Sequence, residues 1–169
     1  MSGIERTIGF RLNGEPVSAA APVRMHAADF LRHRLGWTDT HVGCEQGVCG
    51  MCTVLVDGAA IKSCLMLAVQ LDGTAVTTVE SLADGDRLHA AQAAFKRHHA
   101  LQCGYCTPGF LMLAVSLKAS GRTLSRAEIR EELAGVLCRC TGYETILCAV
   151  EDYLEAGHAP EPPADEASR

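Results

Sequence analysis

Eight of the nine cysteines in this 169-residue chain fall into two sets of four, and no other feature limits the fold as strongly. The first set is Cys44, Cys49, Cys52 and Cys64, and the second set is Cys103, Cys106, Cys138 and Cys140. Four thiolates are enough to complete one metal site or one cluster site. The sequence therefore predicts two such sites, with Cys148 left over.

The first set has the spacing C-x4-C-x2-C, followed by a fourth cysteine after eleven further residues. The first three members match the spacing of plant-type [2Fe–2S] ferredoxins. Glycines at positions 43, 47 and 50 lie among them, and glycine lets a loop turn tightly and aim N–H groups at cluster sulfurs. Zinc sites instead prefer paired C-x2-C knuckles. The spacing favours a cluster over zinc and over packed or redox-active cysteines.

The second set consists of a C-x2-C pair and a C-x-C pair, separated by 31 residues. This spacing alone fits either zinc or a cluster. The context favours a cluster, because Pro108 is typical of a first helical turn and would place Cys106 at a helix N-terminus. The C-x-C pair also precedes a periodic apolar stretch through Ile146 and Val150. Helix N-termini stabilise anionic thiolates.

Three segments carry a more specific signal: CEQGVCGMC at 44–52, QCGYCTPGF at 102–110 and LCRCTGY at 137–143. In this order and spacing they resemble the small iron–sulfur subunit of the molybdenum hydroxylases, the family of xanthine oxidase and bacterial carbon monoxide dehydrogenase. The resemblance extends over residues 3–156. It implies an α+β chain, with a β-grasp plant-type ferredoxin domain over residues 1–82 and an all-α four-helix-bundle domain over residues 83–157. Each domain would hold one [2Fe–2S] cluster on its four cysteines.

The same resemblance implies partners and a function. A large subunit would carry a molybdopterin-type molybdenum cofactor and a medium subunit would carry FAD, in an (αβγ)2 assembly. Gln102 would reach the pterin, the second cluster would lie nearest molybdenum, and the first would lie toward FAD. The chain would then relay single electrons within an oxidoreductase and perform no substrate chemistry of its own. The alternatives are a free-standing ferredoxin-like electron carrier and a zinc-stabilised binding module.

Alternating hydrophobicity and turn residues predict a mixed first half. Asn13-Gly14 and Asp57-Gly58 are strong hairpin turns. A short helix is expected through Ala28, Leu31 and Leu35. The expected strands cover residues 7–12, 16–19, 53–56, 59–62 and 74–78. These elements form an α+β unit that ends near residue 80.

Beyond residue 86 the apolar period changes from two to 3.6. Ser125 and Glu128 form a capping box that opens a helix to Leu133. The other expected helices run through Leu88, Ala91 and Phe95, through Phe110, Leu113 and Leu117, and over residues 143–154. Residues 158–169 are rich in proline, alanine and acidic side chains, so we expect a flexible tail.

Composition excludes several classes of protein. The net charge is −5 with Lys and Arg scattered, which argues against nucleic acid and anionic membranes as partners. No apolar run reaches the roughly 20 residues of a membrane span. The first residues lack a basic segment followed by an apolar core, so we expect a cytoplasmic location. In that reducing compartment, closely spaced cysteines are more often metal ligands than disulfides.

Two positions depart from the family pattern. Val136 stands where the family commonly has Asn, which leaves the cluster ligands unchanged but removes a side-chain amide. Cys148 lies outside the eight expected ligands, and its apolar neighbours favour a buried structural thiol. We expect no catalytic acid, base or nucleophile in the chain, and the histidines at 41, 98 and 99 are interpreted as surface residues.

Overall fold

Two antiparallel hairpins and one further strand build a five-stranded sheet in the first half of the chain. The computed structural model describes residues 4–156, so the expected tail over residues 158–169 lies outside the described residues. The strands are β1 (Glu5–Leu12), β2 (Glu15–Pro22), β3 (Thr53–Val56), β4 (Ala59–Lys62) and β5 (Ala75–Thr77). Their order in the sheet is β2-β1-β5-β3-β4. β1 and β5 run parallel, and the other neighbouring pairs are antiparallel.

The residues between the hairpin strands explain the strand pairing. Asn13 and Gly14 have φ values of 52° and 88°, and Asp57 and Gly58 have φ values of 50° and 81°. Positive φ at both central residues is the signature of the tight turn whose twist matches that of paired strands. Both predicted turns are confirmed. β2 continues to Pro22, beyond the predicted end at residue 19, because its pairing with β1 continues that far.

A short helix crosses one face of the sheet and closes the first core. Helix α1 (Ala27–Asp29) continues directly into a π-helical turn, η1 (Phe30–Arg34), and the ring Nδ1 of His26 accepts the Asp29 N–H at 3.1 Å. Short 3₁₀ segments follow the strands at η2 (Ser63–Leu65), η3 (Ala68–Leu71) and η4 (Val79–Ser81). Phe30 and Leu31 are fully buried against Ile8 and other side chains of the sheet.

Four further helices lie in the second half: α2 (Ala90–Arg97), α3 (Thr107–Ala119), α4 (Arg126–Leu133) and α5 (Glu144–Glu155). The predicted capping box is confirmed, since the Ser125 hydroxyl and the Glu128 side chain each bond the other residue's backbone N–H. The predicted start of α2 was too early. Leu88 precedes the helix and is 44% exposed, because His89 is the residue that caps α2. Within residues 4–156, none of the helices has the length and apolar character needed to cross a bilayer.

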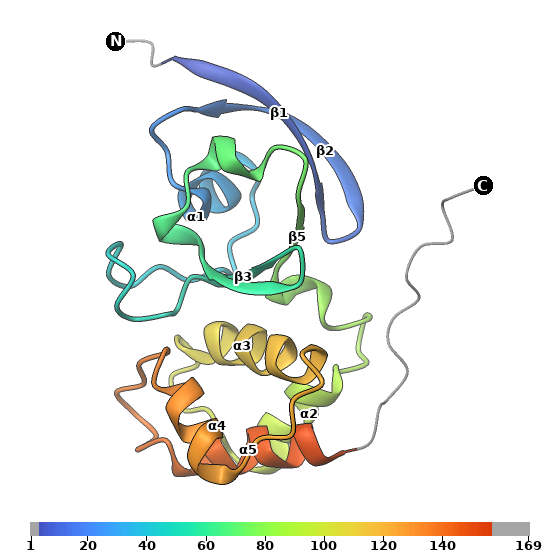
Figure 1. Ribbon diagram of the computed structural model, residues 1–169, viewed down its shortest axis with the longest axis vertical. Coiled ribbons are helices and arrows are strands. Elements are labelled where there is room, and N and C mark those ends of the chain that lie inside the picture. Colours follow the sequence, from blue (N-terminus) through green and yellow to red (C-terminus); the bar gives the residue numbers. More distant parts are fainter. Residues whose placement is uncertain (1–3, 157–169) are drawn as a thin grey trace, which may run out of the picture.

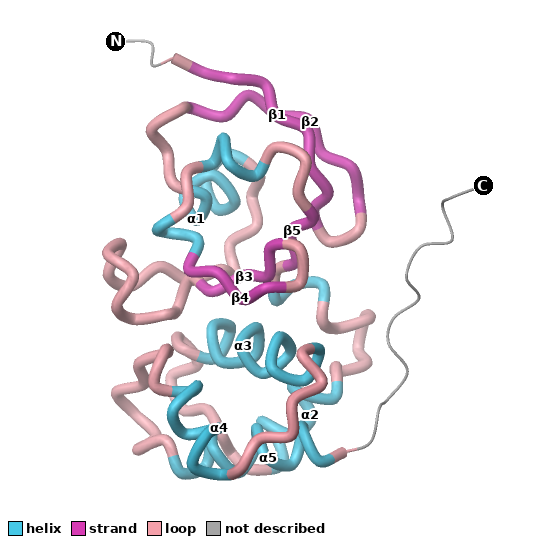
Figure 2. The backbone as a smooth tube through the Cα atoms, viewed as in Figure 1, coloured by secondary structure: helices cyan, strands magenta, loops and turns pink. Residues whose placement is uncertain are grey.

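Strand β3 connects the two halves, which are stacked one above the other in Figure 1. All four of its residues are buried. Val54 and Val56 pack into the core of the sheet, whereas Leu55 points the other way into the core of the helices. Helix α3 lies against β3 and β4 (Figure 2). Because alternate side chains of a strand face opposite sides, this one strand belongs to both hydrophobic cores.

Candidate metal centres

The β3–β4 hairpin and the loop before it bring the first four thiols together. Cys44, Cys49 and Cys52 lie on the loop between η1 and β3, and Cys64 lies in η2 just after β4. The Ser63 N–H and hydroxyl donate to the Cys52 carbonyl at 3.2 and 2.6 Å. This places Cys64 beside Cys52, and the Cys64 thiol acts on the pKa of Cys52.

The other two thiols of this set form a second contact pair. The Cys49 N–H donates to the Cys44 Sγ at 3.3 Å. Backbone N–H groups of Cys49 and Gln46 lower the pKa of the Cys44 thiol to about 7, because they stabilise the thiolate. Burial acts in the opposite direction on Cys52 and raises its pKa to about 11. The loop thus supplies N–H donors on its outer side and apolar cover on its inner side.

The second four thiols come from the start of α3 and the loop before α5. Cys106 is the N-cap residue of α3, and Pro108 lies in the first turn as predicted. The sulfurs of Cys103 and Cys140 are 3.6 Å apart, and the thiol of Cys138 lies close enough to that of Cys106 to raise its pKa. Burial is the main cause that raises the pKa of Cys106 to about 12.

The sulfur of Cys138 has its own donors. Burial raises the pKa of this thiol, but hydrogen bonds from the Thr141 hydroxyl and N–H outweigh burial, so the net shift is downward. The Thr141 hydroxyl lies 3.1 Å from the sulfur, and its N–H donates at 3.4 Å. The Cys138 N–H in turn donates to the Tyr143 hydroxyl at 2.9 Å. The loop before α5 is therefore shaped around this sulfur.

Both sets share one pattern, in which four thiols are arranged as two contact pairs. The pairs are Cys44 with Cys49, Cys52 with Cys64, Cys103 with Cys140, and Cys106 with Cys138. Two pairs suit a cluster of two irons, since each iron takes two of the four thiolates. Among residues 4–156, no three or more Cys, His, Asp or Glu side chains converge on a single ion position. The donor sets and their pairing fit a [2Fe–2S] group.

Each centre has one edge that reaches the surface. Cys103 and Cys140 are exposed, whereas Cys106 and Cys138 are buried. Gln102 and Arg139 are exposed beside the first two. At the other centre, Val48 and Leu65 are 58% and 66% exposed next to the buried Cys49 and Cys64. The sulfurs are thus covered from within the chain and approachable from one outer edge.

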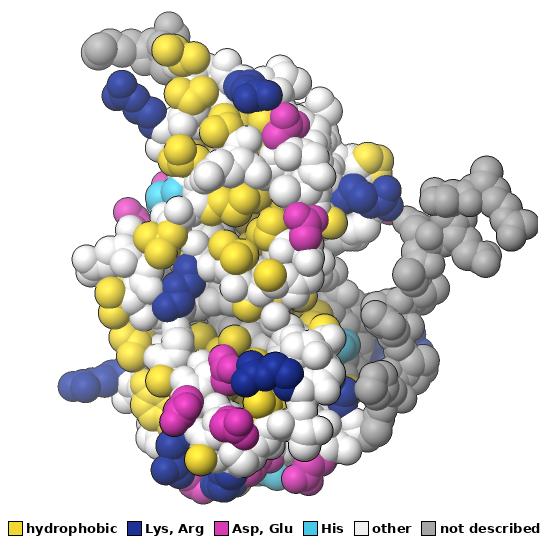
Figure 3. Space-filling view, viewed as in Figure 1, with side chains coloured by type: hydrophobic (Ala, Val, Ile, Leu, Met, Phe, Trp, Pro, Cys, Tyr) yellow, Lys and Arg dark blue, Asp and Glu magenta, His cyan; other side chains and the backbone are white. Residues whose placement is uncertain are grey.

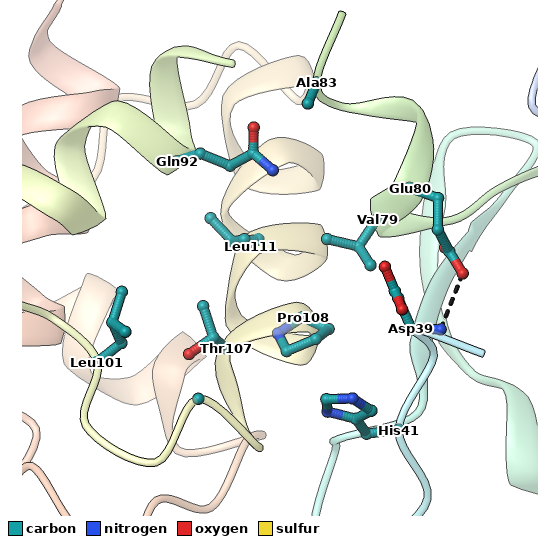
Figure 4. A pocket seen from close by; sticks show the side chains of 11 residues that line it. Asp39, His41, Val79, Glu80, Ala83, Gln92, Leu101, Thr107, Pro108 and Leu111 are labelled. Atoms are coloured by element: carbon teal, nitrogen blue, oxygen red, sulfur yellow. Dashed lines mark hydrogen bonds between the residues drawn. The ribbon is translucent and has the colours of Figure 1, made fainter. Parts of the chain in front are cut away.

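A separate cavity of about 480 Å³ lies between the two halves. In Figure 4, Asp39, His41 and Glu80 line one side of it, and Thr107 and Pro108 of α3 line the other. The Asp39 N–H donates to Glu80 Oε1 at 2.9 Å. The lining includes the glycine between Cys103 and Cys106 but none of the thiols of the described chain. The cavity borders the second centre without being part of it.

Comparisons with known proteins agree with this geometry. A family described as "2Fe-2S iron-sulfur cluster binding domain" matches residues 10–83. A second family, "[2Fe-2S] binding domain", matches residues 78–151. The chain therefore has two domains that bind [2Fe–2S] clusters, and each matched range contains one of the two sets of cysteines.

Full-length relatives decide the family. The nicotine 6-hydroxylase small subunit of Paenarthrobacter nicotinovorans is 52% identical over 145 residues, which cover 86% of this chain and 87% of that subunit. The xanthine dehydrogenase iron-sulfur-binding subunit of Escherichia coli O157:H7 is 43% identical over 148 residues, covering 86% and 92%. A chain of quinoline 2-oxidoreductase from Pseudomonas putida 86 matches with a TM-score of 0.86 at 51% identity, covering 90% and 95%. This chain belongs to the small iron–sulfur subunits of the molybdenum hydroxylases.

The resemblance stated from the three cysteine segments is thereby confirmed. The small iron–sulfur subunit is a mixed α/β chain, and its fold matches that of a solved molybdenum hydroxylase subunit. The face shown in Figure 3 carries Lys and Arg side chains that are dispersed among acidic and apolar ones. This distribution is consistent with the scattered charge noted in the sequence.

Two residues of the small subunit differ from their expected settings. Cys148 is half-buried, and its sulfur lies 4.0 Å from Glu144 and 3.9 Å from Arg126. The expected burial of this thiol is therefore wrong, because the Cys148 sulfur lies beside these charged groups at the surface between α4 and α5. Val136 is 2% exposed and packs in the core of the helices. An asparagine side chain at this position would need hydrogen-bond partners for its amide, whereas valine needs none.

Sequence reasoning missed a contact between the two cysteine loops. The rings of His41 and Tyr105 stack with centroids 4.5 Å apart, and His41 Nδ1 lies 2.8 Å from the Tyr105 carbonyl oxygen. The Tyr105 hydroxyl donates to the Val42 carbonyl at 2.9 Å. His41 precedes the first loop, and Tyr105 lies between Cys103 and Cys106. Their position next to cysteine segments was the one available signal.

Proposed function

We propose that this subunit relays single electrons from a molybdopterin-type molybdenum site on a large partner subunit, through its two [2Fe–2S] clusters, to FAD on a medium partner subunit. The carrying observation is the presence of two thiol quartets in one chain, each arranged as two pairs. A substrate oxidation releases two electrons together, whereas an iron–sulfur cluster passes them one at a time. Two centres in series within one polypeptide suit such a relay.

The eight paired cysteines are the proposed ligands of the two clusters. When bound, each cluster supplies reversible one-electron oxidation and reduction. The chain's own contribution is to hold the thiolates, to direct N–H groups such as those of Cys49 and Thr141 at sulfur, and to exclude water with apolar cover. N–H donors and burial are the two means by which a protein tunes cluster potential.

The domain division follows the two cores. We propose a β-grasp ferredoxin domain over residues 1–82 and a four-helix-bundle domain over residues 83–157. A mixed sheet with parallel neighbours β1 and β5, crossed by α1 and η1, supports the first assignment. Four helices that share one hydrophobic core support the second.

The direction of the relay rests on which edge of the chain meets which partner. We propose that Gln102 contacts the pterin of the large subunit, so that the exposed edge with Cys103 and Cys140 faces molybdenum. The apolar edge with Val48 and Leu65 would then face the flavin subunit, which suits the aromatic and aliphatic character of partner interfaces. An (αβγ)2 assembly in the cytoplasm completes the proposal, since free thiols suit a reducing compartment.

The test uses two cysteine variants and the purified complex. Cys138→Ser removes one ligand of the second centre, so its electron paramagnetic resonance signal should disappear on reduction while the other signal remains. Iron content should fall from about four per chain toward about two, and substrate turnover should stop. Cys148→Ser is the matched control and should keep both signals and full turnover. Retention of both signals by Cys138→Ser would contradict the ligand assignment.

A further inference from the structure

A backbone hydrogen bond joins the loop of the first thiol quartet to the loop of the second. The Leu137 N–H donates to the Cys49 carbonyl at 2.9 Å. Cys49 belongs to the first quartet, and Leu137 directly precedes Cys138 of the second. One path from one quartet to the other therefore crosses the backbone of Cys49, one hydrogen bond, and the backbone of Leu137.

Two glycines allow the chain segments to come this close. Gly109 lies in the first turn of α3, three residues after Cys106. A Cβ added to Gly109 would lie 2.5 Å from the Gly50 carbonyl oxygen and 3.1 Å from the Met51 Cα. These are backbone atoms, so no side-chain rotation can make room. The loop of the first centre would have to move away from α3.

Gly50 makes the reciprocal contact on the other side of the same loop. A Cβ added there would overlap the Gly135 carbonyl oxygen and lie 2.9 Å from the Val136 Cα. Gly50 also has a φ of 69°, which disfavours any side chain. We call this contact the interloop junction, and it consists of residues 49–51, 109 and 135–137.

We propose that Gly50 and Gly109 are positioning residues that fix the distance between the two clusters, because their lack of a side chain lets the two cysteine loops pack backbone against backbone. This inference rests on the proposed function. The step moves one electron, so that one cluster is oxidised by one unit while the other is reduced by one, and no bond is made or broken.

The physical basis is the steep distance dependence of electron tunnelling. Tunnelling decays faster across an open gap than along covalent bonds and hydrogen bonds, so both the separation and the continuity of the path matter. The interloop junction provides both, because close backbone packing sets the separation and the hydrogen bond closes the path. The His41–Tyr105 stack makes a second contact between the same loops and limits their rotation.

Gly109→Ala is the main test, because the backbone there has no positive φ and the added methyl group acts through its contact alone. Gly9→Ala is the matched control, since a Cβ at Gly9 meets nothing within 4 Å and its φ is also not positive. Both variants are prepared in the complete complex. The measurements are iron content, the signal of each cluster, the magnetic coupling between the two reduced clusters, and the intercluster electron-transfer rate after rapid mixing.

In Gly109→Ala, both cluster signals should persist, the magnetic coupling should weaken, and intercluster transfer should slow by on the order of tenfold or more, since displacements of about 1 Å have effects of that order on positioned reactions. Gly9→Ala should behave as the unmodified chain. Unchanged coupling and rate in a fully loaded Gly109→Ala complex would overturn the inference. Absence of a second cluster from the unmodified complex would instead overturn the proposed function.

Val136→Ala keeps the test decisive if Gly109→Ala loses iron. This variant removes methyl groups that pack against Gly50 and creates no clash. The loosened junction should give a broader range of magnetic couplings and slower intercluster transfer with both signals retained. Coupling and transfer identical to those of the unmodified chain would overturn the inference on this variant as well.

Discussion

His89 shows how one half-buried side chain can make the stability of the second half depend on pH. Its ring Nδ1 accepts the Ala91 N–H at 3.1 Å, which caps α2 and requires an unprotonated nitrogen. Burial, and then the nearby Lys118 charge, lower the pKa of His89 below its usual 6.5. The ring also lies 5.7 Å from that of Tyr153 on α5, so the cap belongs to the contact between α2 and α5.

The folded protein should therefore lose stability as the pH falls below about 6.5, the usual pKa of histidine. In this range the unfolded chain binds a proton at His89 that the folded chain does not, so the free energy of unfolding rises with pH. His89→Asn keeps a capping oxygen but cannot titrate, so this contribution should vanish. Thermal unfolding of both proteins between about pH 7 and pH 5 checks the expectation, and equal slopes below about pH 6.5 would contradict it.

Residue identity predicted the cysteine sets, the turn residues and Pro108, because each acts through its immediate sequence neighbours. The roles of Gly109, His41 and Tyr105 could not be predicted in this way. Each contacts a segment more than 50 residues away in the sequence, and the neighbouring cysteines do not indicate which segment that is.

Among the elements, α4 depends most on its ends and its charged contacts. Only Ile129 and Leu133 are buried in this helix. Arg126 pairs with Glu144 and Glu151 of α5, and such exposed pairs contribute little individually. The capping box formed by Ser125 is thus a large part of what defines the helix start.

Ser125→Ala should lower the free energy of unfolding by about 1 kcal/mol, because the N–H of Glu128 loses its acceptor. Ser125→Asp should restore most of this loss, since aspartate caps helices about as well as serine. Chemical denaturation of the three proteins measures the differences. An alanine variant as stable as the unmodified chain would show that water replaces the cap without cost.

Helix α3 shows why the apolar periodicity of the sequence predicted a helix correctly but identified only some of its buried residues. The predicted stripe through Phe110, Leu113 and Leu117 is confirmed as helical, but Leu111, Met112 and Ala114 are buried as well. A stripe on one face predicts a helix covered on one side. This helix lies between the sheet and the other helices (Figure 1), so both of its faces are apolar.

For the whole molecule, the clusters should act as cross-links between distant segments. In the sequence, Cys44 precedes the β3–β4 hairpin and Cys64 follows it, and Cys103 and Cys140 are separated by 37 positions. A group that binds the folded chain in preference to the unfolded chain stabilises the folded one. Its bond energy is then also folding energy.

Removing iron with a chelator under anaerobic conditions should therefore lower the midpoint of thermal unfolding of the complex-bound or isolated subunit. Circular dichroism before and after chelation measures the shift, and rebuilding the clusters with iron and sulfide should reverse it. A midpoint that does not respond to chelation would show that the thiols are held in place by the protein alone.

The order of elements and the presence of two centres were predictable from the sequence, because hairpin turns, helix caps and cysteine spacing are local signals. The way the two halves meet was not predictable. That arrangement depends on β3, whose three apolar residues read as part of an ordinary core strand and give no indication that Leu55 serves a different core from Val54 and Val56.

This shared strand has a consequence for protein engineering and for evolution by recombination. If the first half alone were transplanted into another enzyme, Leu55 would lose the helices that cover it, and an apolar surface would be exposed on the outer side of the sheet. The recipient enzyme would need an apolar element of its own that packs on the sheet in the place of α3. Gene fusions that keep residues 53–119 in one piece should consequently be far better tolerated than those that break this stretch.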